Sequence, residues 1–273
     1  MIPSVDSHGA RIPIVALGTW QLNGDDCVNL VGEALRIGYR HIDTARMYGN
    51  EVEVGEGIRS SGVRRDDIFL TTKVWHEDLR AKDFERSVEQ SLTRLKLPYV
   101  DLILIHWPNP SVPLVETIGA MENVKKRGLA RQIGVSNFTV ALLNEAVRLA
   151  KEPLVTNQIE LHPFIDADKV VAVCRKHGLA VTAYCPIARG NAAGDTVLAR
   201  IGKAHGKSAA QVSLRYLVQQ DIIVLPRTSK VERLKENMAI FDFTLSDAEM
   251  AEIGKLAHRG GRVVDLAFSP AWD

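Results

Sequence analysis

The stretch "HIDTARMYGN", residues 41–50, places a carboxylate and a phenol near each other in the chain. Asp43 ends an apolar run that is typical of a strand, and Tyr48 follows five residues later. A buried carboxylate without a partner costs several kcal/mol or is forced into its neutral form. Asp43 therefore requires a cation, and Lys73 in "TTKVW", near the end of the next strand-like run, is the natural partner.

A phenol beside that ammonium would have its anion stabilised, so the sequence predicts that the pKa of Tyr48 falls below its usual value of about 10. Tyr48 would then be a usable proton donor at neutral pH, as a general acid must be. His106 in "LIHWP" could bind and orient the same substrate oxygen. The simplest reaction for such a set is hydride delivery to a carbonyl carbon. A buried ion pair beside a packed tyrosine explains the same spacing equally well.

Apolar runs rich in β-branched residues alternate with amphipathic stretches along the whole chain. The eight strand-like runs begin at Val15, Tyr39, Ile68, Val100, Arg131, Leu154, Ala180 and Ile222. In one amphipathic stretch the apolar positions with helical spacing are Phe84, Val88, Leu92 and Leu95. Eight strand–helix pairs predict an α/β fold, a parallel (β/α)8 TIM barrel, and leave a doubly wound sheet as the rival.

The sequence predicts two elements outside the eight strand–helix pairs, one at each end of the chain. The segment "SVDSHGARIPI" predicts an N-terminal β-hairpin, and Ser246 with Glu249 three residues later predicts an extra C-terminal helix. The motif "GEGIRS" from Gly55 is one residue short of the dinucleotide-binding pattern and follows no strand, so we expect its glycines to pack a helix. No linker or repeat divides the chain, and residues 1–273 are expected to form one domain.

Seven of the eight predicted strands end in polar residues. These residues are Asp43, Lys73, His106, Ser136, Asn137, Gln158, Glu160, Tyr184 and Arg227. In a parallel barrel such ends share one face, where the catalytic residues of this architecture are found. One polar residue could be a turn or a cap, but seven strands with the same feature predict an active site.

The composition indicates an ordinary protein of the cytoplasm. It is 46% hydrophobic and 25% charged, and the net charge of +1 argues against a nucleic-acid or membrane-surface role. Three cysteines without paired spacing, Cys27, Cys174 and Cys185, fit a reducing compartment. The N-terminus does not resemble a signal peptide, and no apolar run reaches the roughly 18 residues of a membrane span. We expect a cytoplasmic monomer that acts on a small molecule.

Three longer stretches resemble signatures of the aldo-keto reductase family, in the family's order and at similar separations. They are "GYRHIDTARMYGNEVEVG", "RQIGVSNF" and "LPRTSKVERLKEN", and the resemblance extends from about residue 18 to residue 237, with a similar tail "SPAWD". It implies a catalytic tetrad of Asp43, Tyr48, Lys73 and His106, with Tyr48 as the acid. It also implies an NADP-dependent oxidoreductase that binds NADPH or NADP+ without a Rossmann domain.

The resemblance also assigns the nicotinamide end of the cofactor. It places Ser136, Asn137 and Gln158 at the carboxamide and Tyr184 against the ring. Hydroxyl and amide side chains offer the donors and the acceptor that a primary amide needs, and a stacked phenol would fix the ring face. From the residues alone, Ser136 and Asn137 could equally cap the helix that begins near Thr139.

The phosphate and adenine end is assigned to the segment after the last strand. The residues are Pro226, Arg227, Thr228, Arg233, Glu236 and Asn237. The guanidinium group of arginine can donate two hydrogen bonds to phosphate oxygens, and the N-terminus of a helix adds backbone N–H donors. The family usually carries lysine where Arg227 stands, although arginine is a known form. Without the resemblance, the last two residues would be solvated positions on a helix.

The loop "YCPIARG", with Cys185, Ile187 and Arg189, is expected to fold over the pyrophosphate. Cys185 stands where the family commonly has serine, and it could equally be a small buried thiol.

Three tryptophans at strand ends, Trp20, Trp75 and Trp107, predict an apolar-walled substrate pocket. Trp272 could close its rim or pack on the surface. The short connection after His106 and the brief tail predict an open site. The pattern is most similar to the bacterial 2,5-diketo-D-gluconate reductases, which implies reduction of methylglyoxal, related keto sugars and aromatic aldehydes.

Other activities remain open. A metal-dependent barrel hydrolase would use His41, His106 and His162, although their spacing is loose for a metal site. A Schiff-base aldolase would use Lys73 as its nucleophile, against which Asp43 argues by keeping the amine charged. A redox-sensing module that binds the nicotinamide cofactor with little turnover would carry the same cofactor residues.

Overall fold

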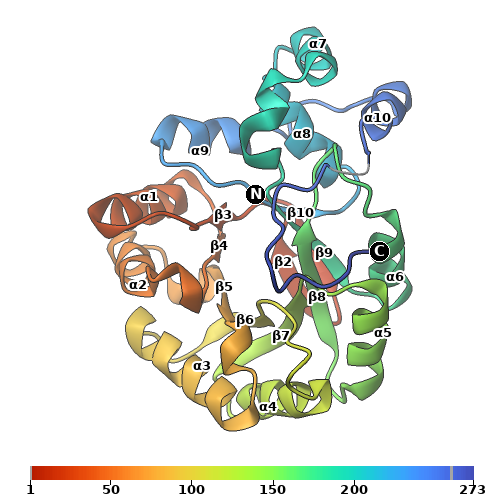
Figure 1. Ribbon diagram of the computed structural model, residues 1–273. Coiled ribbons are helices and arrows are strands. Elements are labelled where there is room, and N and C mark those ends of the chain that lie inside the picture. The colour runs from red at the N-terminus through yellow and green to blue at the C-terminus, as the bar shows by residue number, and fades with distance from the viewer. Residues whose placement is uncertain (1, 259–260) are drawn as a thin grey trace.

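The computed structural model describes residues 2–258 and 261–273. Within these ranges, eight parallel strands form one sheet, in the order β10-β9-β8-β7-β6-β5-β4-β3, with helices around it (Figure 1). A bridge between Val15 and Val224 joins the two edges, and the Ala16 N–H donates to the Val224 oxygen at 2.9 Å. The sheet therefore nearly closes, and the predicted (β/α)8 TIM barrel is confirmed.

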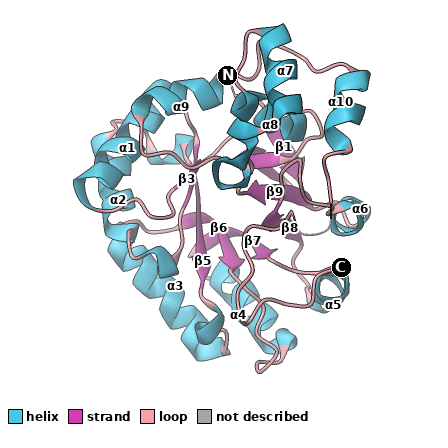
Figure 2. Ribbon diagram, turned by 45° about the horizontal axis from the view of Figure 1, so that its top comes forward, coloured by secondary structure: helices cyan, strands magenta, loops and turns pink. Residues whose placement is uncertain are grey.

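The strands all point toward the same face of the molecule. They are β3 Leu17–Gly18, β4 His41–Asp43, β5 Phe69–Val74, β6 Val100–Ile105, β7 Ala130–Ser136, β8 Leu154–Glu160, β9 Ala180–Tyr184 and β10 Ile223–Leu225. The helices form an outer layer (Figure 2). They are α1 Gly24–Ile37, α2 Glu51–Ser60, α3 Ala81–Leu95, α4 Leu114–Lys126, α5 Val140–Leu149, α6 Asp168–Lys176, α7 Thr196–His205, α8 Ala209–Val218, α9 Val231–Met238 and α10 Asp247–Gly254.

The predicted N-terminal hairpin and C-terminal helix are both present. Strands β1 Ser4–Ser7 and β2 Ala10–Pro13 pair antiparallel across a turn whose two residues have positive φ, as tight hairpins require. The Ser7 hydroxyl donates to the Val155 oxygen at 2.7 Å, which ties the hairpin to the start of β8. A capping box opens α10. Of the helices that the structure describes, none combines the length and apolar character of a membrane span.

The segment before β10 differs from the expectation, because two helices, α7 and α8, stand where one was predicted. Gly206 ends α7 with a φ of 65°, and Ser208 with Gln211 forms a capping box that opens α8. These two local signals end one helix and begin the next.

The glycines of α2 allow neighbouring helices to approach closely, as the sequence predicts. A Cβ on Gly55 would lie 2.2 Å from the backbone oxygen of Leu95 in α3. A Cβ on Gly57 would lie 2.7 Å from the backbone oxygen of Val28 in α1. Both glycines therefore serve packing.

We expect Gly55→Ala to lower the free energy of unfolding by about 2–3 kcal/mol, because only a backbone shift could make room for the methyl group. Gly119→Ala in α4 is the matched control, since its Cβ would meet nothing within 4 Å and should stabilise the helix by about 0.5–1 kcal/mol. Urea unfolding followed by circular dichroism measures both variants. Equal stability of the two would contradict the close helix packing.

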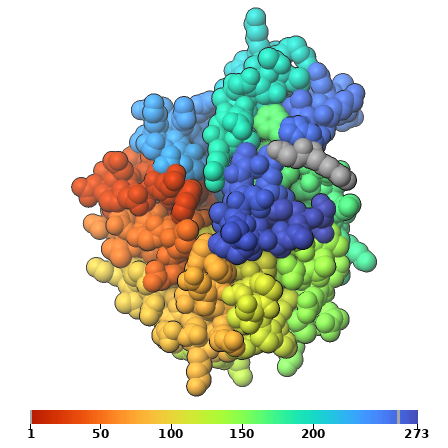
Figure 3. Space-filling view, viewed as in Figure 1, coloured from red at the N-terminus to blue at the C-terminus, as the bar shows by residue number. Residues whose placement is uncertain are grey.

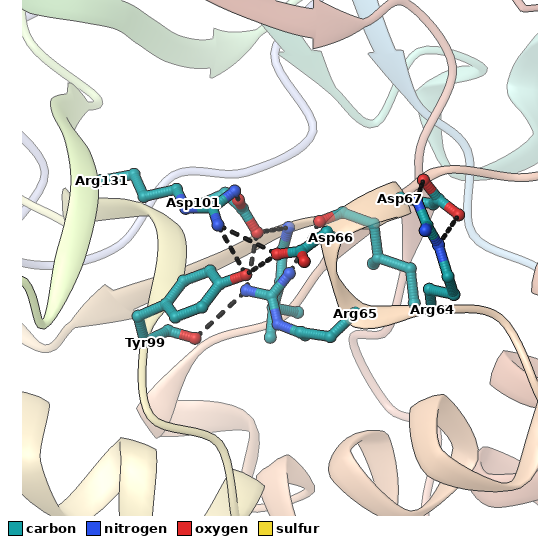
Figure 4. A network of polar contacts seen from close by, with 9 residues as sticks. Arg64, Arg65, Asp66, Asp67, Tyr99, Asp101 and Arg131 are labelled. Carbon is teal, nitrogen blue, oxygen red and sulfur yellow. Dashed lines mark hydrogen bonds and ion pairs between the residues drawn. The ribbon is translucent and has the colours of Figure 1, made fainter.

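A network of charged residues links the amino-terminal ends of β6 and β7, at the end of the barrel opposite the carboxyl ends of the strands. Figure 4 shows this network. The Tyr99 ring lies between the guanidinium groups of Arg65 and Arg131, whose central carbons are 4.3 and 4.1 Å from the ring centroid. Buried Asp101 pairs with both arginines, at 2.7 and 3.3 Å. The network borders a hollow of about 300 Å³ that no member of the predicted tetrad lines. The network therefore stabilises the end of the barrel opposite the carboxyl ends of the strands.

Candidate active site

The carboxyl ends of β4 and β5 bring a buried carboxylate and a buried ammonium together. Lys73 Nζ donates to Asp43 Oδ1 at 2.5 Å and to the backbone oxygen of Thr44 at 2.9 Å. Gln158 Nε2 donates to the other carboxylate oxygen of Asp43 at 2.8 Å. Lys73 is 0% exposed and Asp43 is 2% exposed. The ion pair and its hydrogen bonds offset the cost of burying both charges.

Tyr48 is brought to this pair by a short 3-10 helix, Arg46–Tyr48, after β4. Lys73 Nζ lies 3.4 Å from its phenol oxygen. The buried Asn50 side chain fixes the turn that follows, because its amide donates to the backbone oxygens of residues 19 and 22, each at 2.8 Å. The phenol therefore has a defined position beside the ammonium.

His106 directly follows β6 and faces the same centre. Its ring centroid lies 5.7 Å from that of Tyr48 and 5.1 Å from that of Trp75. Trp20 also packs edge-on against Tyr48, with 4.9 Å between ring centroids. His106 Nδ1 is buried and has no hydrogen-bond partner among the described residues.

The predicted lowering of the Tyr48 pKa is wrong for the protein alone. Burial raises the pKa of Tyr48 well above 10, and the charge of Asp43 adds to the effect. Burial lowers the pKa of Lys73, whereas the charge of Asp43 raises it. Burial and the Lys73 charge hold the pKa of His106 well below 6.5. Phenol and imidazole are therefore neutral at pH 7, and the phenol carries the proton that a donor must have.

The ends of β7, β8 and β9 place hydroxyl and amide groups beside this centre. Ser136, Asn137 and Gln158 are almost fully buried. The Tyr184 hydroxyl donates to Asn137 Oδ1 at 2.7 Å. The helix-cap alternative is wrong, because Thr139 is the residue whose side chain caps α5. Donors and acceptors grouped in this way fit the chemistry of a primary carboxamide.

The predicted phosphate segment lies at the end of β10, next to β3. The exposed guanidinium of Arg227 donates to the backbone oxygens of Trp20 and Gln21, at 3.1 and 3.0 Å. Arg233 is exposed on α9. The other predicted residues here are buried Pro226, Thr228 and Asn237 and half-buried Glu236, which accepts from the Ser208 hydroxyl at 2.6 Å. Both arginines are exposed, and guanidinium groups suit phosphate oxygens.

The loop after β9 has an unusual backbone. Cys185 and Arg189 have φ of 50° and 54°, in the left-handed region that disfavours side chains. Burial, with the charge of Glu160, raises the pKa of the Cys185 thiol to about 11. Half-buried Ile187 packs on the core. Cys185 itself is only half-buried, so it is not the fully buried thiol of the alternative reading.

The three histidines of the metal alternative have separate surroundings. His41 lies near the start of β4, where its ring nitrogens bond the Thr71 hydroxyl and a backbone oxygen. His162 Nε2 lies 3.0 Å from Glu160 Oε1. Within the described ranges, no three His, Cys, Asp or Glu residues are grouped as metal ligands. The geometry therefore does not assemble the hydrolase site.

The C-terminal segment crosses the active face, which sequence reasoning missed (Figure 3). Phe268 stacks on His76 at 4.1 Å and meets Trp75 and Trp107 edge-on at 5.6 and 5.7 Å. Trp272 packs on Trp107 at 6.0 Å, so it lies at the rim of this aromatic cluster. The expectation of an open site is wrong on this side, because the tail covers it. The tail carries no periodic pattern, so its path could not be predicted from the sequence.

Comparison with known proteins identifies the family. Residues 14–258 match the model of the aldo/keto reductase family. Methylglyoxal reductase DkgB of Escherichia coli O157:H7 is 40% identical over 265 residues, which cover 96% of this chain and 99% of that protein. A crystal structure of a putative 2,5-diketo-D-gluconic acid reductase B is 47% identical, with a TM-score of 0.98 over 100% of this chain and 98% of that one. A Bombyx mori aldo-keto reductase in complex with NADP is 34% identical, with a TM-score of 0.90 over 97% of this chain and 96% of that one. The chain therefore belongs to the aldo/keto reductase family.

Proposed function

We propose that the protein reduces small aldehydes and ketones to alcohols with NADPH, and that Tyr48 donates the proton. The observation that carries this proposal is the position of Lys73 Nζ, 2.5 Å from Asp43 Oδ1 and 3.4 Å from the phenol oxygen of Tyr48. An ammonium at that place stabilises the phenolate that remains after proton donation.

When bound, NADPH would supply a hydride to the carbonyl carbon. Tyr48 donates its proton to the carbonyl oxygen as negative charge develops there, which gives the alcohol. Neutral His106 holds the same oxygen by a hydrogen bond and so orients the carbonyl. Lys73, fixed by Asp43, stabilises the phenolate until a proton from solvent restores it.

The residues at the strand ends would hold the cofactor in place. Ser136, Asn137 and Gln158 offer donors and acceptors to the nicotinamide carboxamide. Tyr184 would lie against the ring and fix the face that is turned toward the substrate. The family membership and the relative solved with NADP support this assignment.

We expect Arg227→Ala to raise the Michaelis constant for NADPH roughly 10- to 100-fold, because a charge-assisted bond to the 2′-phosphate is lost. The constant for NADH, which lacks that phosphate, should stay nearly unchanged. Steady-state kinetics with both cofactors measure the two effects. Arg64→Ala, at the opposite end of the barrel, is the control and should change neither constant. Equal losses for both cofactors would remove the 2′-phosphate assignment.

The substrate class follows from the apolar wall and from the relatives. Trp20, Trp75 and Trp107 would surround the carbonyl group with aromatic surface. Relatives named for methylglyoxal and 2,5-diketo-D-gluconic acid support small carbonyl compounds. A panel of methylglyoxal, keto sugars and aromatic aldehydes, assayed by loss of NADPH absorbance, tests the proposal. A turnover number near zero for the whole panel at saturating NADPH would favour a redox-sensing module instead.

A further inference from the structure

One buried carboxylate fastens the C-terminal segment 261–273 to the barrel. Glu160 ends β8, and its side chain is 0% exposed. Its Oε1 accepts from the Val263 N–H at 2.6 Å, and its Oε2 accepts from the Val264 N–H at 2.9 Å. His162 Nε2 adds a contact to Oε1 at 3.0 Å. Hydrogen bonds to an ionised carboxylate are about twice as strong as those between neutral groups.

Arg262 and Asp273 make further contacts that fix the course of the segment. The Arg262 guanidinium lies 3.8 Å from Glu160 Oε2, and its central carbon lies 3.6 Å from the centroid of the Trp272 ring. At the far end, Asp273 Oδ2 accepts from the Val140 N–H in the first turn of α5, at 2.8 Å. The segment is therefore held near both of its ends, and the Glu160 side chain that holds its start is itself 0% exposed.

Between these attachments the segment places one aromatic ring on the active face. Phe268 stacks on His76 at 4.1 Å and meets the rings of Trp75 and Trp107. Trp75 in turn contacts His106, with 5.1 Å between ring centroids. Phe268 thus extends the aromatic wall outward from the imidazole.

We propose that Glu160 is a positioning residue for substrate selectivity: it holds segment 261–273 so that Phe268 forms the outer wall of the carbonyl pocket. This inference rests on the proposed reduction of carbonyl compounds. A flat aromatic substituent on the carbonyl reaches Phe268 and gains contact area there. A short substrate such as methylglyoxal is held near Tyr48 and His106 and does not reach it.

The amide variant separates the carboxylate's role from its volume. Glu160→Gln keeps the shape of the side chain and one accepting oxygen. Its NH2 group, however, is a donor and would face one of the two backbone donors, Val263 or Val264. One hydrogen bond is therefore lost, and two donors oppose each other in a partly buried place, which should release the segment.

The first test compares benzaldehyde with methylglyoxal as substrates. Glu160→Gln should raise the Michaelis constant for benzaldehyde about tenfold and leave kcat, and both constants for methylglyoxal, within about twofold. Phe268→Ala should give the same pattern. Because Glu160 acts through Phe268, the double variant should be no worse than Phe268→Ala alone. Effects that multiply in the double variant, or an equal loss for both substrates, would overturn the proposal.

The second test does not depend on activity. Amide hydrogen exchange at Val263 and Val264 should become about tenfold faster in Glu160→Gln, with the barrel strands unchanged. Glu252→Gln, an exposed carboxylate paired with Arg200, is the control and should leave the segment protected. Unchanged exchange at the two valines would overturn the attachment. If no carbonyl compound is reduced but exchange quickens, the proposed function fails while the attachment stands.

Discussion

Replacement of Tyr48 by phenylalanine is expected to lower kcat for carbonyl reduction about 10²- to 10⁴-fold, the usual contribution of a positioned proton donor. NADPH should bind nearly as tightly as before. Phenylalanine keeps the ring that packs on Trp20 at 4.9 Å and on His106 at 5.7 Å, and loses only the hydroxyl group. Steady-state kinetics measure the loss of turnover, and a fluorescence titration measures cofactor affinity.

Tyr99→Phe is the matched control for this variant. Its hydroxyl bonds Asp66 and Arg131 at the other end of the barrel, so its removal should leave kcat unchanged. If Tyr48→Phe retained full activity while Tyr99→Phe behaved in the same way, the proton would have to come from another group. The assignment of Tyr48 as the acid would then be wrong.

The alternation of strand-like and helical stretches predicted the barrel, and the polar residues at the strand ends then predicted the site. In a parallel barrel all carboxyl ends meet on one face, so residues as distant in the chain as Asp43 and Gln158 could be expected together. They are joined by a hydrogen bond of 2.8 Å. The ion pair with Lys73 followed from the cost of a lone buried charge. Neither inference required knowledge of side-chain packing.

The features that escaped prediction depend on burial or on irregular chain. Whether the pKa of Tyr48 is raised or lowered depends on how far the phenol is removed from water. A sequence does not give the degree of burial. Glu160 was visible as a polar strand end, but its partners, Val263 and Val264, lie more than 100 residues away in a segment without periodicity. Phe268 could not be placed on the active face for the same reason.

A second large effect is expected for Lys73→Met. It should lower kcat about 10²- to 10³-fold, the cost of removing one group that stabilises developing charge. It should also destabilise the protein by about 3–5 kcal/mol, because Asp43 would remain buried without its cation. The two losses have different causes, and a single variant cannot separate them. Kinetics and urea unfolding measure each loss.

The double variant Asp43→Asn, Lys73→Met separates the two causes. It removes both charges, so no unpaired charge stays buried, and most of the lost stability should return. Gln158 can still hydrogen-bond the asparagine that replaces Asp43. Activity should stay as low as in Lys73→Met, because no ammonium remains 3.4 Å from the phenol oxygen to stabilise its anion. If activity returned together with stability, Lys73 would serve only the integrity of the barrel, and the phenol would act without its help.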